Sequence, residues 1–303
     1  MSRLLLSQIQ VKILRYGVPI CMTIGTIGSL AGLLMFTRKP MRKSPCIIIL
    51  IAYILTNLIY INFTMLSAVL SGYNSDFATK SLELCRLRMY VSFVFSAIPS
   101  YLLVLASLDR MFISSADVRI RQRSNRRFAL LMIFGVCLFW IIFHLHAFFY
   151  SEIQLIYNGL QLSCTVRAGG SSTFVSYYGL INAIIPLILM ATFGFRTFIN
   201  MNRFQFRRTN LHSLLDRRLI ALLIIQLNIY VFLRLPTSIY LIYGQITKYD
   251  IKNSNRILVE EFAYFITILC QFIQVCIFPW TNLITKHFRM EFIRVICKLF
   301  RKR

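Results

Sequence analysis

The stretch CRLRMYVSFVFSAIPSYLLVLASLDRM, from Cys85 to Met111, decides the fold. No charged residue lies between Arg88 and Asp109, whereas charged residues stand at both ends of the stretch. As a helix that rises ~1.5 Å per residue, the interval from Cys85 to Arg110 spans about 37 Å. The hydrocarbon core of a bilayer is about 30 Å thick, and about 40–45 Å with its headgroups. The stretch therefore predicts a transmembrane helix with Cys85 at one face of the membrane and Arg110 at the other.

The composition of the whole chain points the same way. Of its 303 residues, 57% are hydrophobic and 15% are charged, whereas a soluble domain has roughly 25% charged residues. A soluble chain this apolar would expose large hydrophobic patches. The 34 Lys and Arg outnumber the 10 Asp and Glu. Because the basic residues cluster between apolar runs, they indicate anionic inner-leaflet lipids and topology control, not nucleic acid.

Seven apolar runs are long enough to cross a bilayer as helices. They lie near residues 13–36, 44–70, 87–108, 127–150, 174–198, 218–244 and 260–285. We therefore predict an all-α membrane protein, a seven-transmembrane-helix bundle over 13–285 with a short extracellular segment, 1–12, before it. The tail, 286–303, has apolar residues at helical spacing opposite basic ones, which predicts a cytoplasmic amphipathic helix at the membrane surface. Cys297 in this tail is a lipidation candidate, with a free thiol as the alternative.

The basic residues also predict the orientation. Most Lys and Arg outside the spans fall in 37–43, 111–127, 196–218 and 286–303, and an excess of Lys and Arg marks the cytoplasmic side. The N-terminus is then extracellular and the C-terminus cytoplasmic. Cys85 and Cys164, which lies in the connecting segment 151–173, are the cysteines predicted on the oxidising outer side. A disulfide between them is expected, with two free thiols as the alternative.

With these features, the chain resembles a rhodopsin-like (class A) G protein-coupled receptor over roughly residues 13–300. The seven spans, the cysteine that opens the third span and the cysteine before the fifth carry the resemblance. So do five further features, namely Asp109-Arg110 at the end of the third span, Trp140, Pro186, Pro236 and Pro279. The resemblance implies a multi-pass receptor of the plasma membrane that binds an extracellular ligand and activates a heterotrimeric G protein. We expect no enzymatic activity, no cofactor and no metal-binding residues.

The resemblance further implies roles for individual residues. Asp109 and Arg110 would form a conformational latch that faces the G protein, and Pro236, Pro279 and Asn282 would belong to the same switch. The residues alone allow this reading, because an arginine beside an aspartate can be paired in one state and released in another. The alternative is an interfacial arginine that reaches the lipid headgroups.

Three departures from the family pattern bear on function. Asn57 stands where the family usually has an aspartate that helps to hold a sodium ion, so we expect no charged sodium ligand there and a hydrogen bond from Asn57 to the seventh span. The stretch 278–282 reads FPWTN where the family has Asn-Pro-x-x-Tyr. Arg234, in the stretch YVFLRLPTSIY, stands where a tryptophan is usual. Either Arg234 binds an anionic ligand group at the floor of the pocket, or it is buried in a polar network or reaches a water-filled cavity. The candidate partners at its depth are Asn228, Gln271 and Gln274.

The ligand class is narrowed by two positions. Ser92 stands where amine receptors of this family carry an aspartate, and Phe272 stands where opsins carry the lysine that binds retinal. A peptide, a lipid or a small chemosensory ligand remains, and we favour a peptide. The candidate pocket residues are Ser92, Arg234 and Gln271.

The sequence lacks features that are typical of transporters, channels and enzymes. Transporters commonly show repeated halves around broken helices, and channels need many polar lining residues. The spans show neither. The sequence also lacks His-Glu-x-x-His and Gly-x-Ser-x-Gly, two common enzyme motifs. A seven-helix transporter or a non-signalling membrane protein is kept as the alternative to a receptor.

Overall fold

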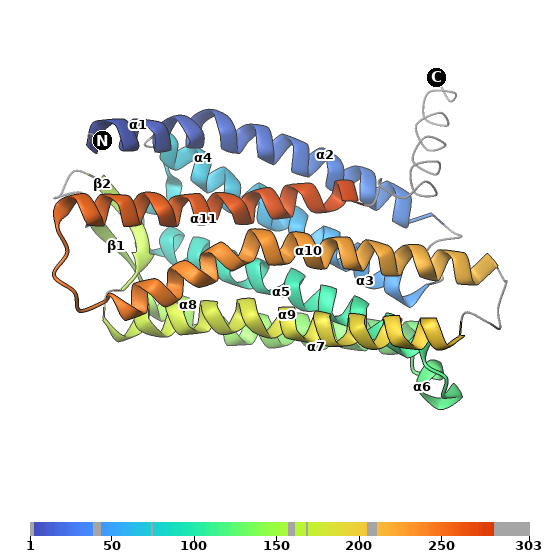
Figure 1. The fold of residues 1–303 in the computed structure, drawn as a ribbon. Coiled ribbons are helices and arrows are strands. Elements are labelled where there is room, and N and C mark those ends of the chain that lie inside the picture. Colours follow the sequence, from blue (N-terminus) through green and yellow to red (C-terminus); the bar gives the residue numbers. More distant parts are fainter. Residues whose placement is uncertain are drawn as a thin grey trace, which may run out of the picture.

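The computed structural model describes residues 3–38, 44–73, 75–156, 161–167, 169–204 and 211–281. The tail 286–303 with Cys297, and Asn282, lie outside these residues. Within the described part, 7 helices are long and apolar enough to cross a membrane. They run alongside one another as one bundle (Figure 1). The predicted fold class, a seven-transmembrane-helix bundle, is confirmed, and the chain is a multi-pass membrane protein.

The spans are built from the following elements. The first comprises α1 (Arg3–Lys12), the π-helical η1 (Ile13–Gly17) and α2 (Val18–Phe36). The second comprises α3 (Pro45–Tyr60), the π-helical η2 (Ile61–Met65) and α4 (Leu66–Gly72). The third is α5 (Leu82–Ser114), and the fourth comprises α7 (Arg126–Phe143) and α8 (His146–Tyr150). The last three are α9 (Gly170–Phe204), α10 (Leu211–Ile246) and α11 (Ser254–Thr281). Two short helices, η3 (Phe77–Thr79) and α6 (Val118–Gln122), flank α5.

Polar side chains fix where α5, the third span, and α7, the first helix of the fourth span, begin. The Ser81 hydroxyl accepts a hydrogen bond from the backbone N–H of Leu84 at 3.3 Å. The Asn125 side chain accepts one from the N–H of Phe128 at 2.8 Å. Both are N-caps, which satisfy backbone donors that the first turn of a helix leaves unpaired. Within the bilayer the helix itself satisfies the remaining backbone groups.

Helix α5 forms the centre of the bundle. It packs against α3, α7 and α9 and also contacts α10. In its apolar stretch 61% of the residues are buried inside the protein, against 17% in the fourth span. Many large side chains of the fourth span face outward, although Trp140 is buried. Helix α5 runs the full length of the bundle. One candidate functional region described below therefore lies near its beginning and the other near its end.

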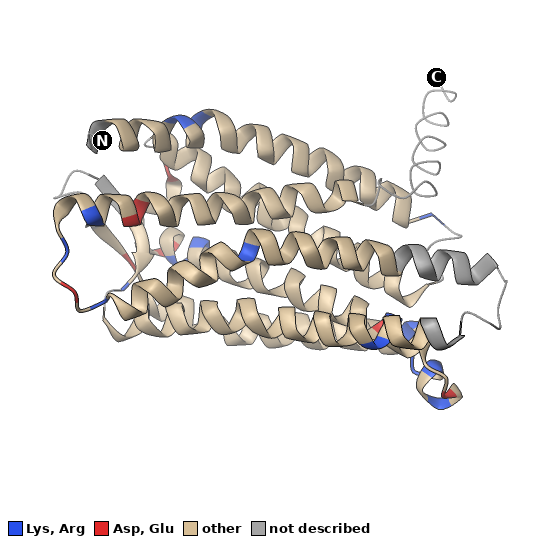
Figure 2. Ribbon diagram, in the orientation of Figure 1, with Lys and Arg blue, Asp and Glu red and all other residues tan. Residues whose placement is uncertain are grey.

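The connecting segment 151–173 contains a β-hairpin. Strand β1 (Ser151–Ile156) pairs antiparallel with β2 (Gln161–Val166), and Ile153 lies opposite Cys164. The hairpin lies at the end of the bundle where α1 begins (Figure 1). We call this end the hairpin end, and the opposite end, where α5 finishes, the Arg110 end. Charged residues gather mainly toward these two ends (Figure 2), as expected for helices that cross hydrocarbon.

The first and seventh spans approach closely at two glycines. A Cβ atom on Gly25 would lie 2.8 Å from Sγ of Cys276, and one on Gly28 would lie 2.6 Å from Nε1 of Trp280. That indole nitrogen donates a hydrogen bond to the carbonyl of Ile24 at 3.2 Å. Small residues therefore allow α2 and α11 to pack backbone against side chain, as is common between membrane helices.

We expect Gly28→Ala to destabilise the protein by about 1–3 kcal/mol, because the added methyl must displace the packed indole of Trp280. The matched control is Gly135→Ala in α7, where an added Cβ meets nothing within 4 Å. The control should be neutral or slightly stabilising, because alanine favours a helix over glycine. Unfolding temperatures of the purified proteins test this, and equal temperatures for the two variants would contradict the close packing.

Candidate functional site

A cavity of about 1270 Å³ extends into the bundle from the hairpin end. Its wall comes from the first, second, third, fifth, sixth and seventh spans. The polar side chains that line it are Ser7, Gln10, Thr64, Ser71, Asp76, Thr79, Arg88, Ser92, Ser96, Ser176, Asn182, Arg234, Thr237, Ser238, Glu261 and Gln271. Hydroxyls and amides predominate, so the wall offers both donors and acceptors of hydrogen bonds.

The structure brings the three predicted pocket residues, Ser92, Arg234 and Gln271, together in this wall. The Ser92 hydroxyl lies 3.2 Å from that of Thr64 in η2. Nη1 of Arg234 donates to Oε1 of Gln271 at 2.8 Å, and Nε2 of Gln271 donates to Oγ1 of Thr237 at 2.8 Å. Arg234 is thus held across the gap between α10 and α11 by a chain of neutral polar groups. These contacts agree with the interpretation that Arg234 is buried in a polar network. Gln271 is one of the partners that the sequence suggested.

Asn57 and Arg234, predicted as a polar core, line one small cavity of about 20 Å³ on the inner side of the large one. Gln271 and Gln274 of α11 line the same small cavity. The Asn57 side chain is buried, and within the described residues neither of its polar atoms meets hydrogen-bond geometry. The hydrogen bond that we predicted between Asn57 and the seventh span is therefore not formed among the described residues, and Asn57 shares only this small cavity with α11.

The cavity also contains an ion pair that sequence reasoning missed. Nη1 of Arg88 lies 2.7 Å from Oδ2 of Asp76. The other oxygen of Asp76 accepts from the Ser67 hydroxyl at 3.2 Å and from the N–H of Ala78 at 3.1 Å. Asp76 is 5% exposed, so the pair is largely shielded from solvent. The charge of Arg88 is neutralised within the wall.

The predicted disulfide is present beside this ion pair. Cys85 in the first turn of α5 is bonded to Cys164 of β2, with their Cα atoms 5.5 Å apart. Both cysteines are buried, in a cluster that includes Ala78 of η3. The bond fastens the hairpin to the start of α5, one turn before Arg88 and two turns before Ser92. It therefore fixes the part of α5 that lines the cavity mouth.

At the opposite end of α5, the predicted latch residues are in contact. Nη2 of Arg110 lies 2.6 Å from Oδ2 of Asp109. The second carboxylate oxygen of Asp109 accepts a hydrogen bond from the Ser124 hydroxyl at 2.5 Å. Ser124 lies in the turn between α6 and α7, and its role was not foreseen, because no local pattern marks it. Both oxygens of Asp109 are therefore engaged.

Arg110 is 2% exposed, although it lies near the end of its helix. Side chains of α9 and α10 surround it, including Met190 and Thr197 from α9 and Leu223 and Leu227 from α10. The arginine thus stands behind the inner ends of the fifth and sixth spans. To reach a partner outside the bundle, these spans would have to separate from α5.

The other predicted switch residues lie along α10 and α11. Pro236 follows Arg234 by two residues within α10. Pro279 is buried within α11 beside Phe278, whose ring lies 3.9 Å from the ring of Tyr53 in α3. The structure places both prolines inside helices, and Asn282 falls outside the described residues.

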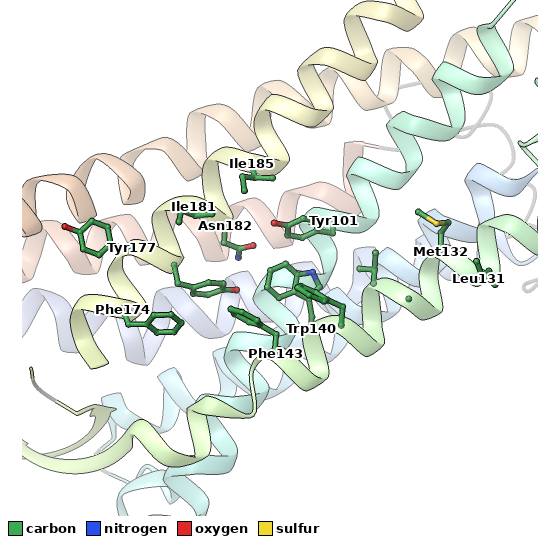
Figure 3. Close-up of a pocket in the computed structure, with 14 residues that line it drawn as sticks. Tyr101, Leu131, Met132, Trp140, Phe143, Phe174, Tyr177, Ile181, Asn182 and Ile185 are labelled. Carbon is green, nitrogen blue, oxygen red and sulfur yellow. The ribbon is translucent and has the colours of Figure 1, made fainter. Parts of the chain in front are cut away.

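A second, apolar hollow of about 800 Å³ lies on the outer surface between α7 and α9. Figure 3 shows Trp140 and Phe143 of α7 and Phe174, Tyr177 and Asn182 of α9 around it. Near its wall the Tyr178 hydroxyl lies 2.9 Å from Nε2 of His144, which joins the two helices. Of the aromatic side chains here, Phe139, Phe174 and Tyr177 are exposed, as is common on membrane helices that face lipid. We regard this hollow as part of the lipid-facing surface.

A family model described as 7 transmembrane receptor (rhodopsin family) matches residues 30–281. This range contains both cysteines of the disulfide, the latch residues Asp109 and Arg110, and Arg234. No curated protein matches the chain.

Proposed function

Since the chain belongs to the rhodopsin family of seven-transmembrane receptors, we propose that it binds an extracellular peptide and activates a heterotrimeric G protein at the plasma membrane. Receptors of this family are generally signalling proteins without enzymatic activity. The hairpin end then faces the outside and the Arg110 end faces the cytoplasm, in accord with the distribution of Lys and Arg in the sequence.

The size and wall of the large cavity support a peptide ligand. Its volume of about 1270 Å³ exceeds the range of about 300–1,000 Å³ typical of small-molecule sites. Its hydroxyls and amides can pair with the N–H and C=O groups that every peptide carries. Amines and retinal are disfavoured because Ser92 and Phe272, which both line the cavity, offer neither the carboxylate nor the lysine that those ligands need.

The buried latch is the single observation that carries coupling to a G protein. Arg110 is 2% exposed and paired with Asp109, which describes a closed cytoplasmic face. A ligand that prefers a state with α9 and α10 displaced would expose Arg110 and shift the population toward it. Basic side chains beside the latch would contact the G protein and anionic inner-leaflet lipids; those in and around α6 are Arg119, Arg121, Arg123, Arg126 and Arg127 (Figure 2).

Basal nucleotide exchange in cell membranes tests the proposal, with a panel of G protein subtypes. We expect Arg110→Ala to abolish the exchange that the wild type catalyses on its cognate subtype. The control is Arg167→Ala, which removes an exposed arginine at the hairpin end, away from the latch, and should retain most of the signal. Exchange that is equal in the wild type and in Arg110→Ala would speak for a transporter or a non-signalling membrane protein.

Ser124 should restrain the latch. Ser124→Ala removes one of the two polar contacts of the Asp109 carboxylate, which is worth about 1 kcal/mol. We therefore expect basal exchange to rise by roughly fivefold. Ser115→Ala is the matched control, because Ser115 lies in the same segment and its hydroxyl, among the described residues, accepts a hydrogen bond only from the backbone N–H of Asp117, at 3.3 Å. An unchanged basal rate in Ser124→Ala would show that the hydroxyl does not hold the closed state.

A further inference from the structure

We propose that Arg234 binds the free C-terminal carboxylate of the peptide ligand at the floor of the cavity. The inference rests on the proposed peptide-binding function and names the chemical group that the site selects. It joins the two readings of Arg234 in the sequence, because the same side chain belongs to a polar network and presents its charge to the cavity.

Within the described part of the chain, Arg234 lacks an anionic partner. Among the described residues, no carboxylate oxygen lies within the 4.0 Å of an ion pair from its guanidinium. Its hydrogen bond runs from Nη1 to the neutral amide of Gln271. A charge held within a membrane span is costly unless it is paired or solvated. An anion arriving in the cavity would supply the missing partner.

Arg88, the other arginine in the same wall, differs from Arg234 in its ion pairing. Arg88 is paired with Asp76 at 2.7 Å and needs no anion from outside. Asp76 and Arg88 neutralise each other in the outer part of the wall, whereas Arg234 lies deeper and has no carboxylate partner among the described residues. The potential of the cavity therefore becomes more positive toward its floor, which orients a ligand with its negative end inward.

The guanidinium of Arg234 is held in position by hydrogen bonds. Gln271 receives one N–H of Arg234 and is itself bonded to Thr237, whose hydroxyl donates to the carbonyl of Thr267 at 3.3 Å. This chain fixes one arm of the guanidinium and leaves other N–H groups of its planar fork for a carboxylate, which can accept two of them in parallel. A site fixed before binding loses less side-chain entropy when the ligand arrives.

The depth of Arg234 below the cavity mouth matches the length of a short C-terminal peptide segment. Arg234 lies 12 residues before Ile246, the last residue of α10 at the hairpin end, or about 18 Å along the helix axis. An extended peptide advances about 3.4 Å per residue, so roughly the last five residues would fill the cavity. The hydroxyls of the wall would face their backbone, and the terminal carboxylate would reach Arg234.

The test uses purified full-length receptor and matched libraries of pentapeptides, one with free C-terminal carboxylates and one with C-terminal amides. The readout is the shift in unfolding temperature, which needs no G protein and so is independent of coupling. We expect the acids to stabilise the wild type at concentrations roughly 10- to 100-fold below the amides, the factor for a hydrogen-bonded charge. In Arg234→Gln this preference should disappear, and in Arg234→Lys it should be partly kept.

Two controls keep the outcome decisive. Arg88→Gln should retain the preference for acids, because that arginine is already paired with Asp76. The unfolding temperature of each variant without peptide shows that it is folded, and Arg234→Lys serves if Arg234→Gln is not. Equal potency of acids and amides, no stabilisation by any acid, or a preference that persists in Arg234→Gln would overturn the proposal. Stabilisation by fatty acids of 8 to 12 carbons alone would overturn it too, by assigning the anion to a lipid.

Discussion

Cys85→Ser is expected to lower the free energy of unfolding by about 4.5 kcal/mol, the chain-entropy value for a disulfide that closes a loop of this length. The bond joins residues separated by 79 positions and fastens the hairpin to α5. Its loss frees the hairpin from the first turn of α5 and loosens the segment that carries Arg88 and Ser92. Ligand binding should therefore fall together with stability.

The measurement is the unfolding temperature of purified protein, with Cys137→Ser as control. Cys137 is a free, half-buried cysteine of α7, and its replacement should cost far less. The double variant Cys85→Ser/Cys164→Ser should match Cys85→Ser, because either change removes the same bond. If reduction or substitution left the unfolding temperature at the wild-type value, the hairpin would be held by its other contacts, such as the ion pair between Arg167 and Glu152 at 3.3 Å.

The bundle was predictable because each span carries its own signal in hydropathy. Length alone distinguishes a spanning helix from a buried soluble one, so the seven helices required no knowledge of tertiary contacts. The hairpin did require it. Strands β1 and β2 are stabilised by each other and by the bond from Cys164 to Cys85, and six-residue strands are too short to stand out in a polar connection. The first helix also begins before residue 13, at Arg3, and its Ser7 and Gln10 line the cavity.

The candidate site also contains both residues that the sequence alone marks and residues that only the fold brings together. Arg234 drew notice because a charge inside an apolar run is costly, and its partner Gln271 could be anticipated from depth along the neighbouring span. The pair of Asp76 and Arg88 was missed because each residue alone reads as a rim charge, and only the fold around η3 brings them within 2.7 Å. Ser124 was missed for the same reason, since its contact with Asp109 depends on how α6 folds back.

Asp109→Asn is expected to raise basal nucleotide exchange at least about tenfold, in the direction opposite to Arg110→Ala. The closed face buries Arg110 against the Asp109 carboxylate at 2.6 Å. Removing one partner of a buried ion pair costs about 3–5 kcal/mol, and most of that cost falls on the closed state, because an open face would let water solvate the arginine. Even half of such a bias moves a two-state equilibrium by more than tenfold.

The matched control is Asp117→Asn, in the same segment. The carboxylate of Asp117 is exposed and caps α6 by accepting from the N–H of Arg119 at 2.8 Å, so its neutralisation should leave basal exchange near the wild-type rate. Exchange is measured in membranes with equal receptor content, on the subtype for which Arg110→Ala abolishes the signal. A basal rate that rises equally in both aspartate variants would point to the net charge of the Arg110 end. A rate unchanged in both would mean that closure depends on the packing of α9 and α10 over Arg110, since the ion pair would then contribute equally to the closed and open states.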